Sequence, residues 1–261
     1  MLWQRLKAST SLSVALALVL VLTATTICSA ATISYGNFGP VNGVMFNDVE
    51  ESSGTDPVPM YGAPDPFSVG LDFDPQSFVA TSNGGNEDIT DGQLNFTIMG
   101  NVNGGIVGID MINLFEAGDY SLTGVGTAAT QALAGAIMRA VVTQIDGVNV
   151  APIDLTPVNS SVGFNLVANP GVVQPWQISL AMNVEGQLTS RGIPHRVGAT
   201  KIEVVIDNQL QTLSQIDSQA FIAKKEFRID VGRDFIPEPS TFALVGIALC
   251  GCGLFARRER N

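Results

Sequence analysis

The sequence predicts an all-β protein built on a single antiparallel β-sandwich, of which the jelly roll is one variant. Three observations predict it: apolar and polar residues alternate with period two in several segments, an Asp-Gly pair separates two such segments, and only one short stretch favours a helix. Side chains along a strand point alternately to its two faces, so this alternation indicates half-buried antiparallel strands. With 46% hydrophobic residues among 261, the chain can bury a core.

The strand pattern is clearest in the second half of the chain. Trp176 opens an alternation that predicts a strand through to Glu185, and residues 162–168 and 201–207 follow the same rule. A further strand is predicted over residues 221–230. Its expected buried face holds Phe221, Ala223, Phe227 and Ile229, and its expected outer face holds Lys224, Glu226, Arg228 and Asp230.

Turn residues organise the remaining segments. Asp146-Gly147 predicts a tight hairpin between residues 137–145 and 148–153, because this pair suits a two-residue turn. Residues 36–68 are rich in Gly, Pro, Asn and Asp and predict long loops with short edge strands. The first half also holds strand candidates at residues 93–98, 106–115 and 120–125, and one candidate short helix at residues 127–135. No second domain is expected.

Charge excludes one class of partner. The chain has 13 basic and 24 acidic residues and a formal charge of −11, which argues against nucleic acid, because phosphates require a basic surface. No Lys or Arg occurs in residues 31–138, where acids are frequent. We expect this acidic half to support solubility through surface repulsion, with divalent-cation binding as the alternative.

Residues 1–30 have the pattern of a secretory signal peptide. Arg5 and Lys7 form a basic start, and residues 14–22 form an apolar stretch of the usual length. Small residues then precede the expected cleavage between Ala30 and Ala31. An uncleaved membrane anchor is the alternative. Either reading places the following residues outside the cytoplasm.

Residues 236–261 form a second targeting segment. Pro237, Glu238, Pro239 and Ser240 precede an apolar run over residues 241–256, which is short for a transmembrane helix but can span a locally thinned bilayer. A basic tail follows in residues 257–261, and its arginines act as a stop-transfer signal that should stay cytoplasmic under the positive-inside rule. These are Arg257, Arg258 and Arg260. Residues 31–235 would then be the exported β-sandwich domain.

The order of motif, short helix and arginine cluster resembles the PEP-CTERM sorting signal. Residues 237–240 match the family motif position by position, and Arg257 and Arg258 match its basic end. The resemblance covers about 25 residues at the C-terminus. It implies recognition by an exosortase in the inner membrane of a Gram-negative bacterium. It also implies removal of the tail and export to the cell surface or the extracellular matrix.

The exported region offers few groups for catalysis. The chain has three cysteines, and none of them lies in this region: Cys28 is in the signal peptide, and Cys250 and Cys252 are in the C-terminal tail. A disulfide, a thiol nucleophile and a thiolate zinc site are therefore excluded there. His195, the only histidine, lies in a predicted loop, and no Gly-x-Ser-x-Gly motif accompanies it. We expect neither a catalytic residue nor a zinc site.

Acidic residues near the middle of the first half are weak calcium candidates. Oxygen-rich loops suit Ca²⁺, which takes six to eight oxygen ligands, but the EF-hand pattern is absent. The candidates are Asp72, Asp74, Glu87, Asp88 and Asp91. A solvated acidic loop is the simpler interpretation, so no cofactor is expected.

These observations leave three functional hypotheses. The first is a non-enzymatic exported surface or matrix protein, with the exosortase and the secretion machinery as partners. The second is a carbohydrate-binding module, with or without calcium, that binds exopolysaccharide; a face with clustered Trp or Tyr would favour it and smooth polar faces would not. Trp176 is expected in the core, and Tyr35, Tyr61 and Tyr120 form no platform by spacing. The third is a secreted hydrolase with two carboxylates.

Overall fold

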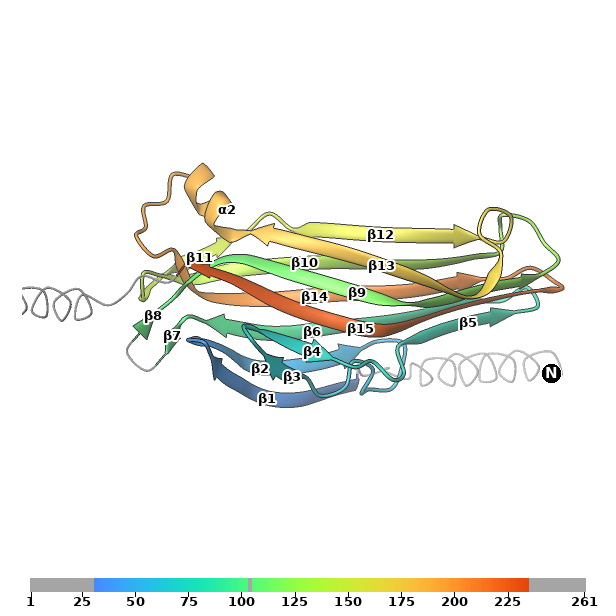
Figure 1. The fold of residues 1–261 in the computed structure, drawn as a ribbon, viewed down its shortest axis with the longest axis horizontal. Helices are drawn as coiled ribbons and strands as arrows, with labels where there is room; N and C mark the ends of the chain where they lie inside the picture. The colour runs from blue at the N-terminus through green and yellow to red at the C-terminus, as the bar shows by residue number, and fades with distance from the viewer. Residues whose placement is uncertain (1–30, 103–104, 235–261) are drawn as a thin grey trace, which may run out of the picture. The chain divides into compact units, whose positions relative to one another are not determined.

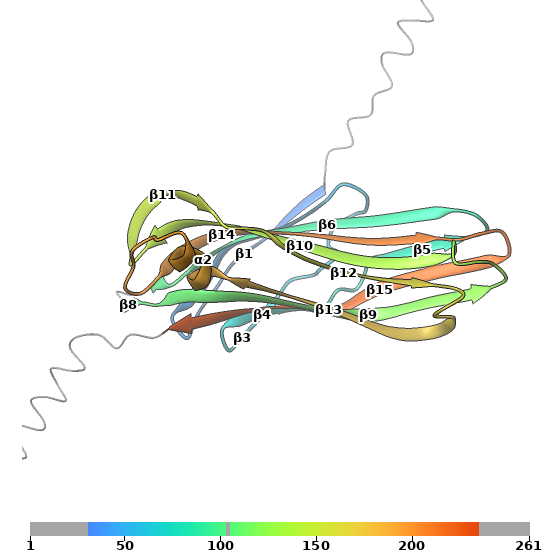
Figure 2. The same cartoon turned by 90° about the horizontal axis from the view of Figure 1, so that it is seen from above.

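The computed structural model describes residues 31–102 and 105–234, which form two facing antiparallel β-sheets with one short helix (Figure 1). The turned view separates the two layers (Figure 2). The all-β, antiparallel prediction is thus confirmed. The predicted signal peptide and the predicted sorting signal, including the helix over residues 241–256, lie outside the described residues. The described residues contain no helix with the length and hydrophobicity of a membrane span.

The first sheet, called sheet A, has the strand order β1-β2-β6-β14-β10-β11, and β12 also pairs with β10. The central pair, β14 and β10, is in register over most of its length. The strands are β1 (Ala31–Val41), β2 (Val44–Ser53), β6 (Glu87–Met99), β14 (Ala199–Leu213), β10 (Gln131–Ile145), β11 (Val148–Asp154) and β12 (Val158–Asn165).

The second sheet, called sheet B, has the order β13-β9-β15-β4-β3, and β5 also pairs with β15. Its strands are β13 (Gly171–Asn183), β9 (Gly108–Gly124), β15 (Ser218–Asp234), β4 (Gly70–Phe73), β3 (Asp65–Phe67) and β5 (Val79–Asn83). A separate small ribbon pairs β7 (Asn101–Val102) with β8 (Gly105–Ile106). The helix, α2 (Val184–Ser190), follows β13 at one end of the sandwich (Figure 1).

Alternating apolar side chains of both sheets fill the space between them. Leu94, Phe96 and Ile98 of β6 belong, with inward residues of β9 and β15, to one hydrophobic core. Trp176 is 4% exposed and its indole N–H donates to the carbonyl of Ala223 at 3.1 Å, so the predicted core role of this residue is confirmed. Aromatic side chains bury large areas, and Tyr61, Phe73, Phe78 and Phe227 pack edge to face.

The Asp-Gly hairpin is confirmed. Asp146 and Gly147 both have positive φ, 52° and 78°, and join β10 to β11 with Ile145 opposite Val148. Two consecutive residues of positive φ match a type I′ turn, whose twist suits the flanking strands.

Three local predictions were wrong. Residues 36–53 belong largely to two long strands, with β2 between β1 and β6, because β2 alternates buried and half-buried positions despite its many turn formers. Residues 127–135 contain a turn and the start of β10, with no helix there. The strand from Trp176 ends at Asn183, whose side chain accepts the N–H of Gly186 at 2.6 Å and caps α2.

The predicted faces of residues 221–230 were also wrong in part. A register shift between Lys224 and Glu226 marks a β-bulge opposite Gly118 of β9. A bulge adds one residue and shifts the alternation, so Ile222 and Lys224 are buried before it and Phe227 after it. Lys224, predicted to face water, is 1% exposed.

Candidate functional site

An open pocket on the outer face of sheet A, called the sheet A groove, crosses four adjacent strands and has a volume of about 560 Å³. Strand register explains its lining, because residues opposite one another on neighbouring strands share a face. Asp91 lies opposite Gln209, Gln209 opposite Gly135, and Gly135 opposite Ser161. These four residues form a row that crosses β6, β14, β10 and β12. Gly135 has no side chain, so the row has a gap at its position in β10.

Asp91 is held rigidly at one end of the groove. Its Oδ1 accepts the backbone N–H of Thr55 at 2.9 Å, the Thr55 hydroxyl at 2.6 Å and the N–H of Gly54 at 3.1 Å. Burial acts to raise the pKa of Asp91, but these hydrogen bonds and one from Ser53 outweigh it, so the pKa lies below its usual value. Asp91 is therefore an anion that orders the loop after β2.

The next row of the groove carries the charge pair. Asp207 of β14 lies opposite Gln93 on one side and Ile137 on the other, and it pairs with Arg139 of β10. Gln93 donates to the other Asp207 oxygen at 2.6 Å. The groove thus presents amide, hydroxyl and ionic groups held by the strands, an arrangement that can hydrogen-bond a hydroxyl-rich ligand.

Aromatic side chains do not line this groove among the described residues. Tyr61 and Tyr120 are in the core, and the Tyr35 hydroxyl donates to the buried carboxylate of Glu51. None of the three tyrosines therefore lies in the sheet A groove. Of the three, Tyr120 stacks on Phe164 of β12 with centroids 3.9 Å apart.

The calcium candidates are not brought together. Asp72 lies on β4 of sheet B and Asp74 just after it, whereas Glu87, Asp88 and Asp91 lie on β6 of sheet A. The last three accept hydrogen bonds from the protein, Glu87 from Gln211 at 2.5 Å and Asp88 from the N–H of Thr81 at 2.6 Å. No group of three or more His, Cys, Asp or Glu suited to a metal ion occurs in the described part of the chain.

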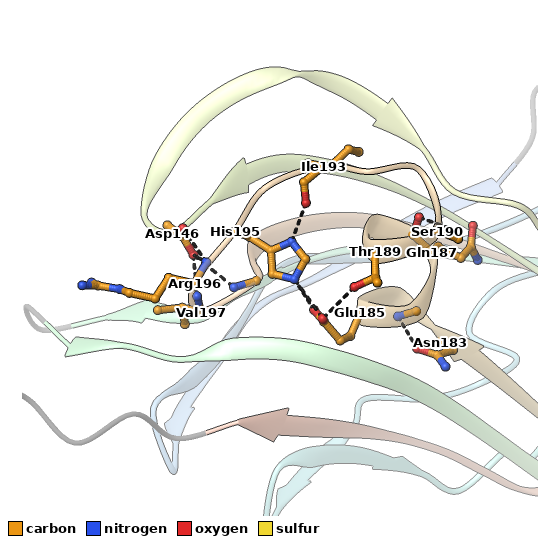
Figure 3. Close-up of polar contacts among 12 residues, drawn as sticks. Asp146, Asn183, Glu185, Gln187, Thr189, Ser190, Ile193, His195, Arg196 and Val197 are labelled. Carbon is orange, nitrogen blue, oxygen red and sulfur yellow. Dashed lines mark hydrogen bonds and ion pairs between the residues drawn. The ribbon is translucent and has the colours of Figure 1, made fainter.

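His195 lies in a second polar cluster at the end of the sandwich that carries α2 (Figure 3). Its loop, between α2 and β14, was predicted and is confirmed. The ring Nε2 is 2.8 Å from the Glu185 carboxylate of α2, and Nδ1 is 2.8 Å from the carbonyl oxygen of Ile193. Thr189 donates its hydroxyl to the same carboxylate at 3.0 Å. An adjoining pocket of about 450 Å³ is bordered by Asp110 and Arg196.

Both ring nitrogens of His195 face acceptors, so both are satisfied only when the ring is a doubly protonated imidazolium. The hydrogen bond to Glu185 is the main reason that the pKa of His195 is raised, and it outweighs the opposing effect of burial. Asp146 of the β10–β11 turn accepts the N–H groups of Arg196, Val197 and Gly198 and adds a nearby negative charge. A cationic ring in this arrangement fastens the loop to α2 and is a poor general base.

Sequence reasoning missed the groove and the buried charges. The groove arises from register between strands far apart in the chain, such as Gly135 with Ser161 and Gln209. The one usable signal was the run of polar residues at every second position from Asp207 in β14, namely Asp207, Gln209 and Gln211. No local signal marks Lys224 as buried, because the bulge that turns it inward depends on pairing with β9.

Comparisons with known proteins give only distant likenesses. No protein-family model and no curated protein matches the chain. Among solved structures, it is similar to a non-crystalline cellulose specific carbohydrate-binding module (10% identity, TM-score 0.26, covering 66% of this chain and 79% of the other). It is also similar to a family 12 xyloglucanase from Bacillus licheniformis (9% identity, TM-score 0.23, covering 78% of this chain and 100% of the other). Likeness at this level transfers neither ligand nor activity.

Proposed function

We propose that this chain is a non-enzymatic exported protein whose β-sandwich is displayed at the cell surface or in the extracellular matrix after processing by an exosortase. The observations that support it most are the two terminal sequence patterns: the signal-peptide pattern of residues 1–30, and the Pro-Glu-Pro motif, apolar run and arginine cluster of residues 236–261. The strands of the described part lie between these two segments, so removal of both would leave each of those strands whole.

The state of the groove carboxylates supports a non-enzymatic role. Hydrolysis of a glycoside needs one carboxylic acid with a raised pKa as proton donor and a second carboxylate. In the groove, hydrogen bonds lower the pKa of Asp91, and Asp207 is tied to Arg139 and Gln93. Neither residue is placed as a proton donor. We therefore favour display or binding over the two-carboxylate hydrolase.

The sorting step can be tested by replacing Pro237, Glu238 and Pro239 together with alanine in the native host. We expect the variant to keep residues 241–261 and to remain in the inner membrane. The wild-type protein should end near residues 237–240 and begin at Ala31. Intact-mass spectrometry of membrane, surface and medium fractions measures both ends. Glu259→Ala in the basic tail is the matched control and should behave as wild type. Normal tail removal in the triple variant would refute the proposal.

A second candidate function is binding of an extracellular polysaccharide in the sheet A groove. The supporting observation is the row of Asp91, Gln209 and Ser161 around the gap at Gly135. Recognition would rest on hydrogen bonds, because no aromatic side chain lines the groove in the described residues.

This candidate predicts that Gln209→Ala weakens retardation of the domain in gels containing the host's own exopolysaccharide. Gln219 is the matched control, since it is an exposed strand glutamine on sheet B, and Gln219→Ala should migrate as wild type. Equal retardation of the two variants would exclude the groove as the binding site.

A further inference from the structure

Four polar side chains meet in the core between the two sheets and are called the core cluster: Lys224 of β15, Glu116 of β9, Asn208 of β14 and Tyr61 of the segment after β2. None is more than 3% exposed. Burying a lysine and a glutamate is costly unless they are paired, and such pairs often add little stability over apolar residues. Stability alone is therefore a weak reason for placing these groups here.

One carboxylate joins the amine to the amide. Glu116 Oε2 lies 2.9 Å from Nζ of Lys224, and Glu116 Oε1 accepts the side-chain N–H of Asn208 at 2.6 Å. Lys224 comes from sheet B and Asn208 from sheet A. A primary amine and a carboxamide from opposite sheets thus contact the two oxygens of one carboxylate.

The carbonyl of the Asn208 amide is polarised from its other side. The Tyr61 hydroxyl has two acceptors in reach, Asn208 Oδ1 at 2.6 Å and the carbonyl oxygen of Gly92 at 3.1 Å, and the shorter contact is the one to Asn208. Tyr61 is itself fixed, since its backbone N–H donates to the buried Glu51 carboxylate at 3.2 Å. A positioned donor on a carbonyl oxygen stabilises the negative charge that develops there when a nucleophile attacks.

The surroundings make Lys224 easier to deprotonate than an exposed lysine. Nζ lies 4.4, 5.0 and 5.3 Å from the ring centroids of Phe78, Phe227 and Tyr61. Within the described structure, Nζ has no polar partner other than the Glu116 carboxylate at 2.9 Å. Burial lowers the pKa of Lys224 to about 8, an effect that Glu116 only partly opposes. Desolvation of this kind is a recognised way to activate a lysine.

We propose that Lys224 and Asn208 form an intramolecular isopeptide bond that covalently joins the two sheets. Lys224 Nζ attacks Cγ of Asn208, the Nζ–Cγ amide bond forms, the Cγ–Nδ2 bond breaks and ammonia leaves. Glu116 takes a proton from the lysine nitrogen and delivers one to the departing Nδ2, while Tyr61 hydrogen-bonds the oxyanion. The reaction is an amide exchange and needs no oxidant, reductant or cofactor.

The bond would supply what the exported region lacks. Residues 31–236 contain no cysteine, so no disulfide can join the sheets. A link between residues 208 and 224 closes the loop between the consecutive strands β14 and β15, and closing a loop restricts the unfolded chain. The bond does not depend on the exosortase proposal and can form in the full chain.

The sequence allows a direct test. An endoproteinase that cleaves before aspartate separates residues 207–216 from residues 217–229, because Asp207, Asp217 and Asp230 are the only aspartates in that part of the chain. Asn208 and Lys224 then lie in different peptides. The denatured, digested wild-type chain should yield the two peptides as one joined species, lighter than their sum by one ammonia molecule. Two separate peptides of full mass, after incubating the folded chain near the lowered Lys224 pKa, would overturn the proposal.

Variants identify the reacting groups. Lys224→Met and Asn208→Ala should each give separate peptides. Glu116→Gln, in which the new side chain has nearly the same size, should slow or abolish the joining of the two peptides. Lys225→Met is the matched control, since Lys225 is exposed next to Lys224, and it should remain joined. Loss of ammonia that persists in Lys224→Met would indicate a succinimide at Asn208, and a product that has lost water and includes Glu116 would indicate a different bond. Either result contradicts the proposal. If a variant fails to fold, the wild-type digest still shows whether the two peptides are joined.

Discussion

Glu116 with Lys224 and Glu185 with His195 are both carboxylate–cation contacts shorter than 3 Å, but they lie in very different surroundings. The first is in the core, with both side chains 1% exposed. In the second, at the end of the sandwich, 42% of the Glu185 side chain is exposed. The pKa of the cation is lowered in the first contact and raised in the second.

The difference shows which force dominates in each place. Around Lys224, aromatic rings replace water, and desolvation outweighs the attraction of Glu116. Around His195, water still solvates the carboxylate, and the hydrogen bond to it dominates. The core contact therefore holds a lysine that loses its proton more easily than usual, and the end contact holds a cationic ring in place.

The largest expected effect comes from breaking the core contact on one side. Glu116→Leu leaves Lys224 as a free buried amine without its carboxylate, and this loss alone should reduce the free energy of unfolding by about 3–5 kcal/mol. Adding Lys224→Met should recover part of the loss, because neither variant is expected to carry the proposed bond and the second change removes the unpaired buried amine. Urea unfolding followed by tryptophan fluorescence measures both. Glu226→Leu, an exposed position on the same strand, is the control; if Glu116→Leu were no worse than this control, the core contact would contribute nothing.

Two glycines near the two contacts sharpen the comparison. A Cβ on Gly118 would lie 1.9 Å from the carbonyl oxygen of Ala223 at the bulge beside Lys224. Gly118→Ala should therefore cost about 3 kcal/mol, the upper end for overpacking. Gly192, in the His195 loop, has φ +67° and open space around it, so Gly192→Ala should cost only about 1–2 kcal/mol of backbone strain. Thermal unfolding of the two variants shows which substitution destabilises the protein more. A larger loss for Gly192→Ala than for Gly118→Ala would contradict this account of the bulge.

The end contact can be broken by Glu185→Gln. Because His195 is the only histidine, a single imidazole resonance reports its titration by NMR. Its pKa should lie above 6.5 in the wild type and fall in the variant. Because the pKa of His195 is higher in the folded than in the unfolded state, protonation of His195 stabilises the fold below pH 6.5. This stabilisation is lost as the pH rises through the folded-state pKa. The stability difference between the two proteins should shrink over that interval; a difference constant with pH would argue against the imidazolium.

The smallest effect is expected for the exposed pair of Arg139 and Asp207 in the groove. Half of the Arg139 side chain is exposed, so water and salt screen the pair. Arg139→Ala should change the free energy of unfolding by about 0–1 kcal/mol. Chemical denaturation at low and high salt is the measurement. A loss as large as that of Glu116→Leu would mean that exposure does not govern the strength of these contacts.

Much of the fold was predictable where local rules were sufficient. Alternation predicted strands in β13 and β14, and Asp146-Gly147 predicted the hairpin, because both depend on residues close together in the chain. The strand predicted over residues 162–168 was right in part, since β12 ends at Asn165 and a turn follows. The length of β2 and the helix α2 were missed. A strand flanked by two partners tolerates turn-forming residues, and a seven-residue helix capped by Asn183 has too few residues for a clear period.

The sites were less predictable than the strands. The acids expected to share calcium, Asp72 and Asp74 with Glu87, Asp88 and Asp91, are divided between two sheets. Conversely, Glu116, Asn208 and Lys224 meet although more than 90 residues separate the first two. Proximity in the sequence was therefore a poor guide to proximity of charged groups in this sandwich.

The sequence by itself determined the all-β class, the absence of thiols from residues 31–236, and the expectation of two targeting segments, because composition, period and terminal motifs are properties of the chain alone. Tertiary structure alone decided which charges are buried. A single extra residue in β15, accommodated opposite Gly118, moves Lys224 from the water-facing side into the core. Since strand alternation has period two, one bulge is enough to exchange the two faces, and only pairing with β9 locates it.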